Sequence, residues 1–309
     1  MAAELVSRDF EGPLASRLAL VEDEAIVVNW LGQAGFIIRD GRRRILVDPY
    51  LSDTLAIKYA DTPTPHDRLM PPPITVEELG RVDLALITHQ HTDHMDPGTL
   101  APLARLNPRL RFVAPRAART ETIRRAGVSD ERLILLDAGE TASPLAGVQI
   151  SAIPAAHETL ERDADGFHRF LGYGLAITQS GRAPVSLVHS GDTIPFPGQV
   201  EEVARLRPDL LMAPVNGRSA RLAALGIAGN MNLDEAIELT VRSGAPAMIA
   251  HHHGMFAFNT LPLAEIEARA AAPGLPIRLI PAREGLEVRL TGDKRGKPRY
   301  PERVMHDSR

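Results

Sequence analysis

A six-residue segment of this chain, His-Gln-His-Thr-Asp-His, holds four potential ligands for a divalent metal. These are His89, His91, Asp93 and His94. It follows the apolar, strand-like run 82–88, so the ligands would lie at a sheet edge, where open α/β sheets carry their sites. In an extended segment His89 and His91 point the same way and can reach one metal, while Asp93 and His94 can face a second. The cluster is typical of half of a two-metal hydrolytic site.

Three later strand-like runs are each followed by a further candidate ligand. A single His or Asp after a strand is usually a hydrogen-bonded loop residue, but together these positions converge on one sheet edge. The combination predicts one composite metal site, and the spacing leaves open which histidine of the last group takes part. The candidates are His157 after 148–153, Asp192 after 185–189, and the triplet His251, His252 and His253 after 247–250.

The composition is that of a globular protein, and it limits the ligands available to a metal. The 309 residues are enough for a large core, and 44% hydrophobic with 24% charged residues is ordinary for globular proteins. The chain has no cysteine, so His, Asp or Glu must hold any metal. The net charge of −4 gives no reason to expect nucleic acid, and no apolar run approaches a membrane span. Residues 1–20 lack an uninterrupted apolar region, so we predict no signal peptide and a cytoplasmic enzyme.

The elements that must position these ligands are strands joined first by tight turns and later by helices. Asp40-Gly41 is a strong hairpin signal between two early strands, and Asp96-Pro97 predicts a helix start with Asp96 as N-cap. Residues 51–81 are rich in proline and read as an insertion that is functional or part of an interface. The pattern predicts two sheets flanked by helices in one domain, residues 1–290, with a charged tail at 291–309. The other predicted strands are 25–31, 36–38, 45–47, 110–113, 173–178, 209–213, 277–280 and 286–290, and the other helices are 116–126, 200–206, 233–243 and 263–271.

The order His89-x-His91-x-Asp93-His94, then His157, Asp192 and a late His, resembles the metallo-β-lactamase fold superfamily over most of the chain. The resemblance implies an α/β fold, a four-layer αββα sandwich of two mixed sheets flanked by helices. It also implies two divalent metal ions, for which Zn²⁺, Mn²⁺ and Fe²⁺ all suit a His/Asp site. It places His89, His91 and His157 on the first metal and Asp93, His94 and His252 on the second, with Asp192 bridging.

The same resemblance implies a hydrolytic mechanism. Two metals about 3.5–4 Å apart would bind and acidify a water, and the resulting hydroxide would attack a carbonyl or phosphorus. Asp93 and Asp192 would be the catalytic carboxylates, Asp192 as the bridge and Asp93 as a ligand that also accepts a hydrogen bond from the nucleophile. Asp48 ends a strand, and it either orients a metal-binding His or caps the turn.

A narrower similarity, to the L-ascorbate-6-phosphate lactonase family, rests on four short motifs. It implies a homo-oligomeric lactonase that opens a small anionic cyclic ester, perhaps a phosphorylated sugar acid. Asn216, Arg218, Asn230 and His253 would bind the substrate, Arg218 through its anionic group. Arg218 in a surface ion pair and Asn230 as a turn former are the competing interpretations. A phosphodiesterase, or a non-catalytic metal-binding protein, is the alternative function. The motifs are Trp30-Leu31-Gly32, Ala213-Pro214-Val215-Asn216-Gly217-Arg218, Gly229-Asn230-Met231-Asn232 and His252-His253-Gly254-Met255-Phe256.

Overall fold

The strands form two mixed sheets that pack face to face in a computed structural model, which describes residues 3–294. Both sheets combine antiparallel and parallel pairs, as the sequence predicts. The first sheet has the order β1 (Glu4–Asp9), β15 (Leu286–Thr291), β2 (Glu22–Gly32), β3 (Gly35–Gly41), β4 (Arg43–Val47), β5 (Leu84–Leu86), β6 (Arg111–Pro115) and β7 (Leu133–Leu136). The second has the order β14 (Arg278–Pro281), β13 (Ala247–His251), β12 (Leu210–Pro214), β11 (Val185–His189), β10 (Leu171–Ile177), β9 (Val148–Pro154) and β8 (Thr141–Leu145).

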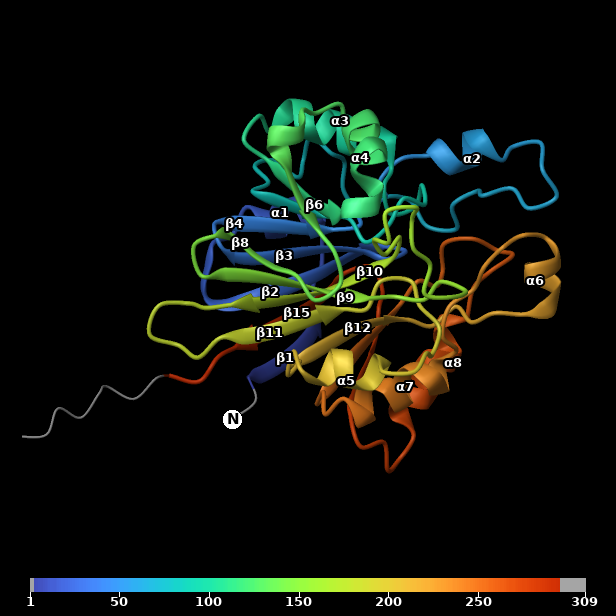
Figure 1. Ribbon diagram of the computed structural model, residues 1–309. Coiled ribbons are helices and arrows are strands. Elements are labelled where there is room, and N and C mark those ends of the chain that lie inside the picture. Colours follow the sequence, from blue (N-terminus) through green and yellow to red (C-terminus); the bar gives the residue numbers. More distant parts are fainter. Residues whose placement is uncertain (1–2, 295–309) are drawn as a thin grey trace, which may run out of the picture.

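Helices cover the outer face of each sheet, which gives four layers, and the predicted αββα architecture is confirmed (Figure 1). Two short helices, α2 and α6, instead project from one side of the sandwich. The helices beside the first sheet are α1 (Leu14–Leu18), α3 (Pro97–Leu106) and α4 (Arg119–Ala126), with the 3-10 turns Arg116–Ala118 and Asp130–Arg132. Those beside the second are α5 (Gln199–Ala204), α7 (Leu233–Arg242) and α8 (Leu263–Ala271), and the projecting pair are α2 (Thr54–Lys58) and α6 (Ala220–Ala224).

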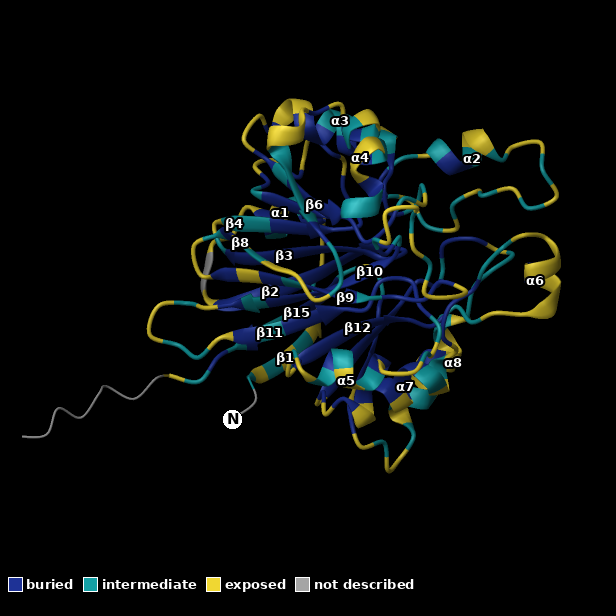
Figure 2. Ribbon diagram, viewed as in Figure 1, coloured by how far each residue is buried: buried dark blue, intermediate teal, exposed yellow. Residues whose placement is uncertain are grey.

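The apolar side chains form one core between the sheets and one beneath each helical layer. Ile38 and Leu86 of the first sheet belong to the same buried cluster as Leu175 and Ile249 of the second. Figure 2 shows the strands buried along most of their length, while the outer faces of the helices are exposed. No helix in residues 3–294 is long and apolar enough to cross a membrane.

Four strand ends meet at one edge of the sandwich. The carboxyl ends of β9, β11 and β13 point the same way, because β9 and β11 both pair antiparallel with β10, and β11 to β13 run parallel. The end of β5 is tied to the second sheet there, since Tyr173 Oη donates to Ile87 O at 3.0 Å and Leu171 N donates to Thr88 O at 3.1 Å. The loops carrying the candidate ligands therefore face one another.

The proline-rich insertion contains α2 and is otherwise irregular, and it is attached to the body of its own chain. Arg68 Nη1 donates to Tyr50 O at 3.1 Å, and Leu69 N donates to Met255 O at 2.9 Å. These contacts join the segment to its own chain, and the homo-oligomer stays a prediction that light scattering would test. The predicted tail lies outside the described residues from residue 295 onward.

The local predictions agree with the structure in part. Asp96 caps α3 by accepting from Gly98 N, as predicted. The early hairpin forms, but Asp40 pairs with Arg43, so its turn lies one residue later than predicted. The sequence analysis missed β1, β7 and β8. All three lie at sheet edges. Of these, β1 alternates without a buried face, and β8 carries Pro144 beside a bulge.

Candidate metal centre

The loop from β5 to α3 holds the first four candidate ligands in one compact turn. His94 N and Met95 N both donate to His91 O, at 3.1 and 2.8 Å. The turn begins at the buried His89 and ends at Asp96, the N-cap of α3. A strand on one side and a capped helix on the other thus fix the backbone of the segment.

The loops of the second sheet bring the remaining ligands to the same place. Gly191 has φ +66°, and a Cβ there would lie 2.3 Å from Leu171 O, so only glycine lets the chain turn toward Asp192. Thr193 Oγ1 accepts from Ala156 N at 3.1 Å, which joins the Asp192 loop to the loop that carries His157.

The ligand atoms gather in three sets, within each of which they lie inside 4.8 Å of one another. Two of these sets contain the residues that the superfamily resemblance assigns to the two metals, and the third joins one residue from each of them to Asp192. Asp192 Oδ2 lies 3.0 Å from His252 Nε2, 3.3 Å from His94 Nε2 and 3.8 Å from His157 Nε2. The sets are His89, His91 and His157; His89, His94 and Asp192; and Asp93, His94 and His252.

Several of these atoms are buried without a hydrogen-bond partner, which supports a metal as their missing partner. They include His89 Nε2, His94 Nε2 and Asp192 Oδ1. Burial and the neighbouring His94 and His91 rings hold the pKa of His89 well below its usual value, so its ring is neutral. Neutral imidazoles beside ionised carboxylates are the state that a divalent cation requires. The residues present therefore fit a divalent metal centre.

Asp48 orients one of these rings rather than only closing the turn. Its Oδ2 lies 2.7 Å from His94 Nδ1, and its two oxygens also accept from Thr88 N at 2.8 Å and Thr88 Oγ1 at 2.6 Å. This contact places a proton on His94 Nδ1 and leaves Nε2 facing Asp192. Burial lowers the pKa of His94, but Asp192, Asp93 and Asp48 together raise it well above its usual value. Metal binding would therefore release a proton from this ring.

Gln33 is a member of the site that the sequence analysis missed. It is buried, has φ +50°, and donates from Nε2 to Asp93 Oδ2 at 2.8 Å. Its carbonyl accepts from His252 N at 3.0 Å and from Trp30 Nε1 at 3.0 Å, so the turn after β2 positions two candidate ligands. The only signal in the sequence was that Gln33 directly follows the Trp30-Leu31-Gly32 motif.

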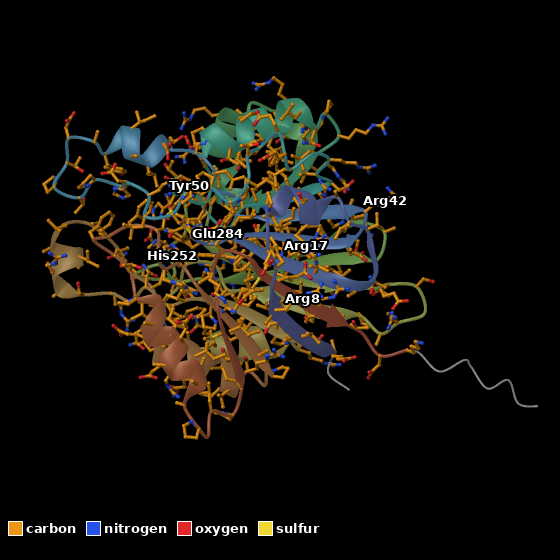
Figure 3. The ribbon with its side chains drawn as sticks, turned by 180° about the vertical axis from the view of Figure 1, so that it is seen from behind. Arg8, Arg17, Arg42, Tyr50, His252 and Glu284 are labelled. Atoms are coloured by element: carbon orange, nitrogen blue, oxygen red, sulfur yellow. The ribbon has the colours of Figure 1, made fainter. Side chains whose placement is uncertain are left out.

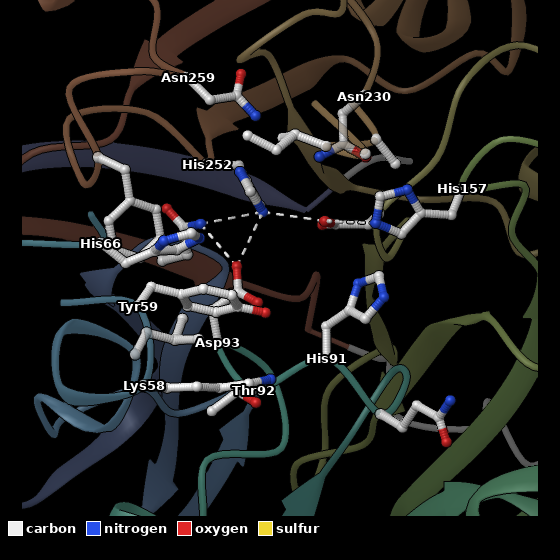
Figure 4. Close-up of a pocket in the computed structure, with 18 of the residues that line it drawn as sticks. Lys58, Tyr59, His66, His91, Thr92, Asp93, His157, Asn230, His252 and Asn259 are labelled. Carbon is white, nitrogen blue, oxygen red and sulfur yellow. Dashed lines mark hydrogen bonds and ion pairs between the residues drawn. The ribbon is translucent and has the colours of Figure 1, made fainter. Parts of the chain in front are cut away.

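The structure separates the three histidines of the triplet. His252, with φ +61°, is the one whose ring reaches Asp192 and Asp93 (Figure 4). His251 lies in the interior, 4.8 Å from the ring of His189. His253 stacks on Trp30 at 5.6 Å and is absent from the cavity lining, so the geometry gives it a packing role instead of the predicted substrate contact.

Comparison with known proteins agrees with this geometry. Residues 43–253 match the model of the beta-lactamase superfamily domain. The chain belongs to this superfamily. A solved structure of an isothiocyanate hydrolase from Delia radicum gut bacteria has the same fold, with a TM-score of 0.67, 18% identity, and coverage of 86% of this chain and 100% of that one.

Three relatives illustrate the level of sequence identity between this superfamily member and other proteins. A Mycobacterium tuberculosis protein is 30% identical over 146 residues, 47% of this chain, so the match spans only 38% of that relative's length. A metal-dependent hydrolase of Methanoculleus marisnigri is 27% identical over 74% of this chain and 81% of its own. N-acyl-phosphatidylethanolamine-hydrolyzing phospholipase D 1 of Caenorhabditis elegans is 24% identical over 77% of this chain and 66% of its own.

In this superfamily member the metal centre opens into a cavity of about 890 Å³. Carboxylates and imidazoles form one part of its lining, and Lys58 and Arg169 add positive charge. Aromatic and aliphatic side chains from the insertion, from the loop after β13 and from the loop after α6 complete it. These are Leu55, Tyr59, Phe256, Phe258, Leu225 and Ile227.

The predicted substrate residues after β12 are only partly in this cavity. Asn230 lines it and donates from Nδ2 to Asn216 Oδ1 at 3.0 Å. Arg218 lies beside a smaller hollow, and its guanidinium binds both oxygens of Glu235 at 2.6 and 2.7 Å. Because Glu235 occupies the planar fork, the geometry favours the surface ion pair over the predicted anion site. Glu235 lies 17 residues further along the chain, so no local pattern could reveal this partner.

Proposed function

We propose that this protein is a two-metal hydrolase that cleaves an ester, with lactones as its leading substrate class. The observation that carries the proposal is the convergence of seven candidate ligands, five of which line an open cavity. No ligand position of the predicted set is missing. A protein that only stores a metal has no need for two adjoining ligand sets with a carboxylate between them.

The residues have distinct tasks in such a reaction. His89, His91 and His157 would hold one metal, and the Asp93 set would hold the other, with Asp192 common to both. When bound, the metals supply Lewis-acid activation of water and of the scissile oxygen. Burial raises the pKa of Asp93, but the neighbouring His94 and His252 outweigh burial and bring the pKa below its ordinary value. The carboxylate is therefore ionised at neutral pH. Its side chain is 17% exposed, and it can accept a hydrogen bond from a water at the cavity floor.

The anionic group of the proposed substrate has cationic partners inside the cavity. Arg124 and Arg125 are paired with Glu121. Lys58 and Arg169, in contrast, have no carboxylate partner among residues 3–294. These two cations therefore replace Arg218 as the proposed contacts for an anionic lactone.

A phosphodiester is the second candidate substrate. Two observations favour it: the similarity to the nematode phospholipase D, and a cavity larger than a small sugar lactone requires. The two-metal arrangement suits attack on phosphorus as well as on carbon.

One assay separates these candidates. The protein loaded with Zn²⁺, Mn²⁺ or Fe²⁺ is offered an anionic lactone, its neutral analogue and a nitrophenyl phosphodiester, with His91→Ala as the metal-deficient control. The proposal predicts lactone hydrolysis that His91→Ala abolishes, and a higher KM for the neutral lactone. Preferential cleavage of the phosphodiester would support the second candidate function in place of the first. Equal rates in the control would reject both.

A further inference from the structure

His66 lies in the cavity within a group of aromatic rings. Its ring stacks on Tyr59 at 4.3 Å with the planes 24° apart. It meets Phe256 and Phe258 edge to face, at 4.9 and 4.7 Å between centroids. Three rings from two separate segments therefore fix the orientation of this imidazole, although the sequence around it carries no motif.

The backbone that holds this aromatic group is well attached. The insertion donates from Leu69 N to Met255 O, next to Phe256. Arg68 lies over the Tyr50 ring at 4.6 Å, and Tyr50 belongs to the same apolar cluster as Phe256. The group is thus a built part of the cavity wall.

The two ring nitrogens of His66 differ in their hydrogen bonding. Nδ1 lies 2.8 Å from Thr64 O, and because a carbonyl can only accept, Nδ1 carries a proton. Burial lowers the pKa of His66 despite the opposing effects of Thr64 and Asp93. The neutral ring therefore presents Nε2 as a hydrogen-bond acceptor, and Nε2 has no partner among the described residues.

The same cavity connects His66 to the metal centre. Both His66 and His252 line it, and Figure 4 shows them on the same side of the Asp93 carboxylate. Phe256 follows His252 by four residues, so the loop after β13 contributes both a candidate metal ligand and part of the aromatic wall. A substrate held at the metals would extend along these rings.

We propose that His66 is a specificity-determining residue of an aromatic-walled subsite, which takes an apolar, ring-shaped part of the substrate bearing an O–H or N–H group. Tyr59 and Phe258 contact the apolar part, and His66 Nε2 accepts the hydrogen bond. The inference deepens the proposed function, on which it rests for the reaction but not for the binding. It predicts that the preferred ester carries a hydroxylated or amino-bearing ring.

The binding test uses phenol and anisole, in which a methyl group replaces the hydrogen of the O–H donor. Their affinities for the metal-free protein are measured by NMR titration. Wild type should bind phenol about five- to tenfold more tightly, the value of one neutral hydrogen bond. His66→Phe keeps a ring, and His66→Asn keeps only the Nδ1-side donor. Both variants should bring the ratio of phenol to anisole affinity to about one. His66→Gln, which returns an acceptor near the Nε2 position, should restore part of it.

The reaction test uses 4-hydroxyphenyl acetate and 4-methoxyphenyl acetate with the metal-loaded protein. The ratio of their kcat/KM values should fall in the same order of variants, with unchanged metal content and thermal midpoint. If no variant or wild type hydrolyses an ester while the phenol preference still depends on His66, the subsite stands and the proposed function falls. A phenol-to-anisole ratio that is unchanged in His66→Phe, with hydrolysis retained, would overturn the subsite alone.

Discussion

Two clusters of buried charge lie in different parts of this molecule, and their contacts differ in kind. Glu287 of β15 is fully buried and accepts from Arg8 at 2.7 Å, Arg17 at 2.8 Å and Arg39 at 3.2 Å. Arg8 of β1 and Arg17 of α1 lie away from His252 (Figure 3). In this arginine cluster each charged side chain contacts an opposite charge within the chain, since three guanidinium groups bind the one carboxylate.

The metal centre is the opposite case. Its imidazoles and carboxylates face one another, and buried atoms such as His89 Nε2 and Asp192 Oδ1 have no partner. An unpaired buried polar atom costs free energy, so such an arrangement persists where an added ligand completes it. Completed pairing in the chain therefore indicates structure, and incomplete pairing of good ligand atoms indicates function.

The largest effect should follow from Asp192→Ala, because this carboxylate adjoins both ligand sets. We expect metal content to fall and hydrolysis to drop at least about a thousandfold, since the metals contribute several kcal/mol to transition-state stabilisation. Elemental analysis and kinetics of the folded variant measure both. Full occupancy and activity would remove Asp192 from the bridging position.

Glu287→Gln should lower the stability of the protein and leave the metal centre unchanged. It leaves the buried Arg39 without its carboxylate, so the free energy of unfolding should fall by about 3 kcal/mol, with metal content and kcat/KM unchanged. Denaturant unfolding measures the loss, and Glu238→Gln, whose exposed pair with Arg242 contributes little, is the matched control. Loss of metal in Glu287→Gln would undo the distinction between the clusters.

The arginine cluster also predicts a pH dependence. Burial raises the pKa of Glu287, but the hydrogen bonds and charges of Arg17 and Arg8 lower it below its ordinary value of 4.5. A depressed carboxylate pKa contributes stability that is complete above pH 4.5 and is lost as the pH falls toward the folded-state pKa. Acid unfolding should therefore show a smaller pH dependence in Glu287→Gln than in wild type, and parallel curves would contradict this.

Asp48→Asn should have an intermediate effect, since Asp48 acts on the metal centre through His94. The amide keeps the shape but no longer offers two acceptor oxygens to Thr88 and His94, so metal affinity should fall about 10- to 100-fold. Competition with a chelator measures this affinity, and excess metal should restore most of the activity. An unchanged affinity would show that Asp48 serves only the turn.

The sequence predicted that the candidate ligands lie together, because they follow strands. His89, His157 and Asp192 each lie in the loop shortly after an apolar strand, and the ends of such strands meet at one edge by the geometry of the sheets. Gln33 and His66 are different, because they lie in irregular segments whose position depends on long-range packing. No periodicity or motif places His66 beside Phe256, which is 190 residues away in the chain.

The smallest effect should come from Arg218→Ala, and it decides between the two interpretations of this side chain. The Arg218 side chain is 41% exposed and Glu235 24%, so their ion pair should contribute at most about 1 kcal/mol to stability. Glu235 keeps its bond to Asn232 N in the capping box of α7, which limits the loss further. The KM values for an anionic and a neutral lactone should keep their ratio in the variant, while Arg169→Ala should raise the KM of the anionic one alone. A selective rise of tenfold or more in Arg218→Ala would mean that the substrate displaces Glu235 and that the guanidinium binds the anion after all.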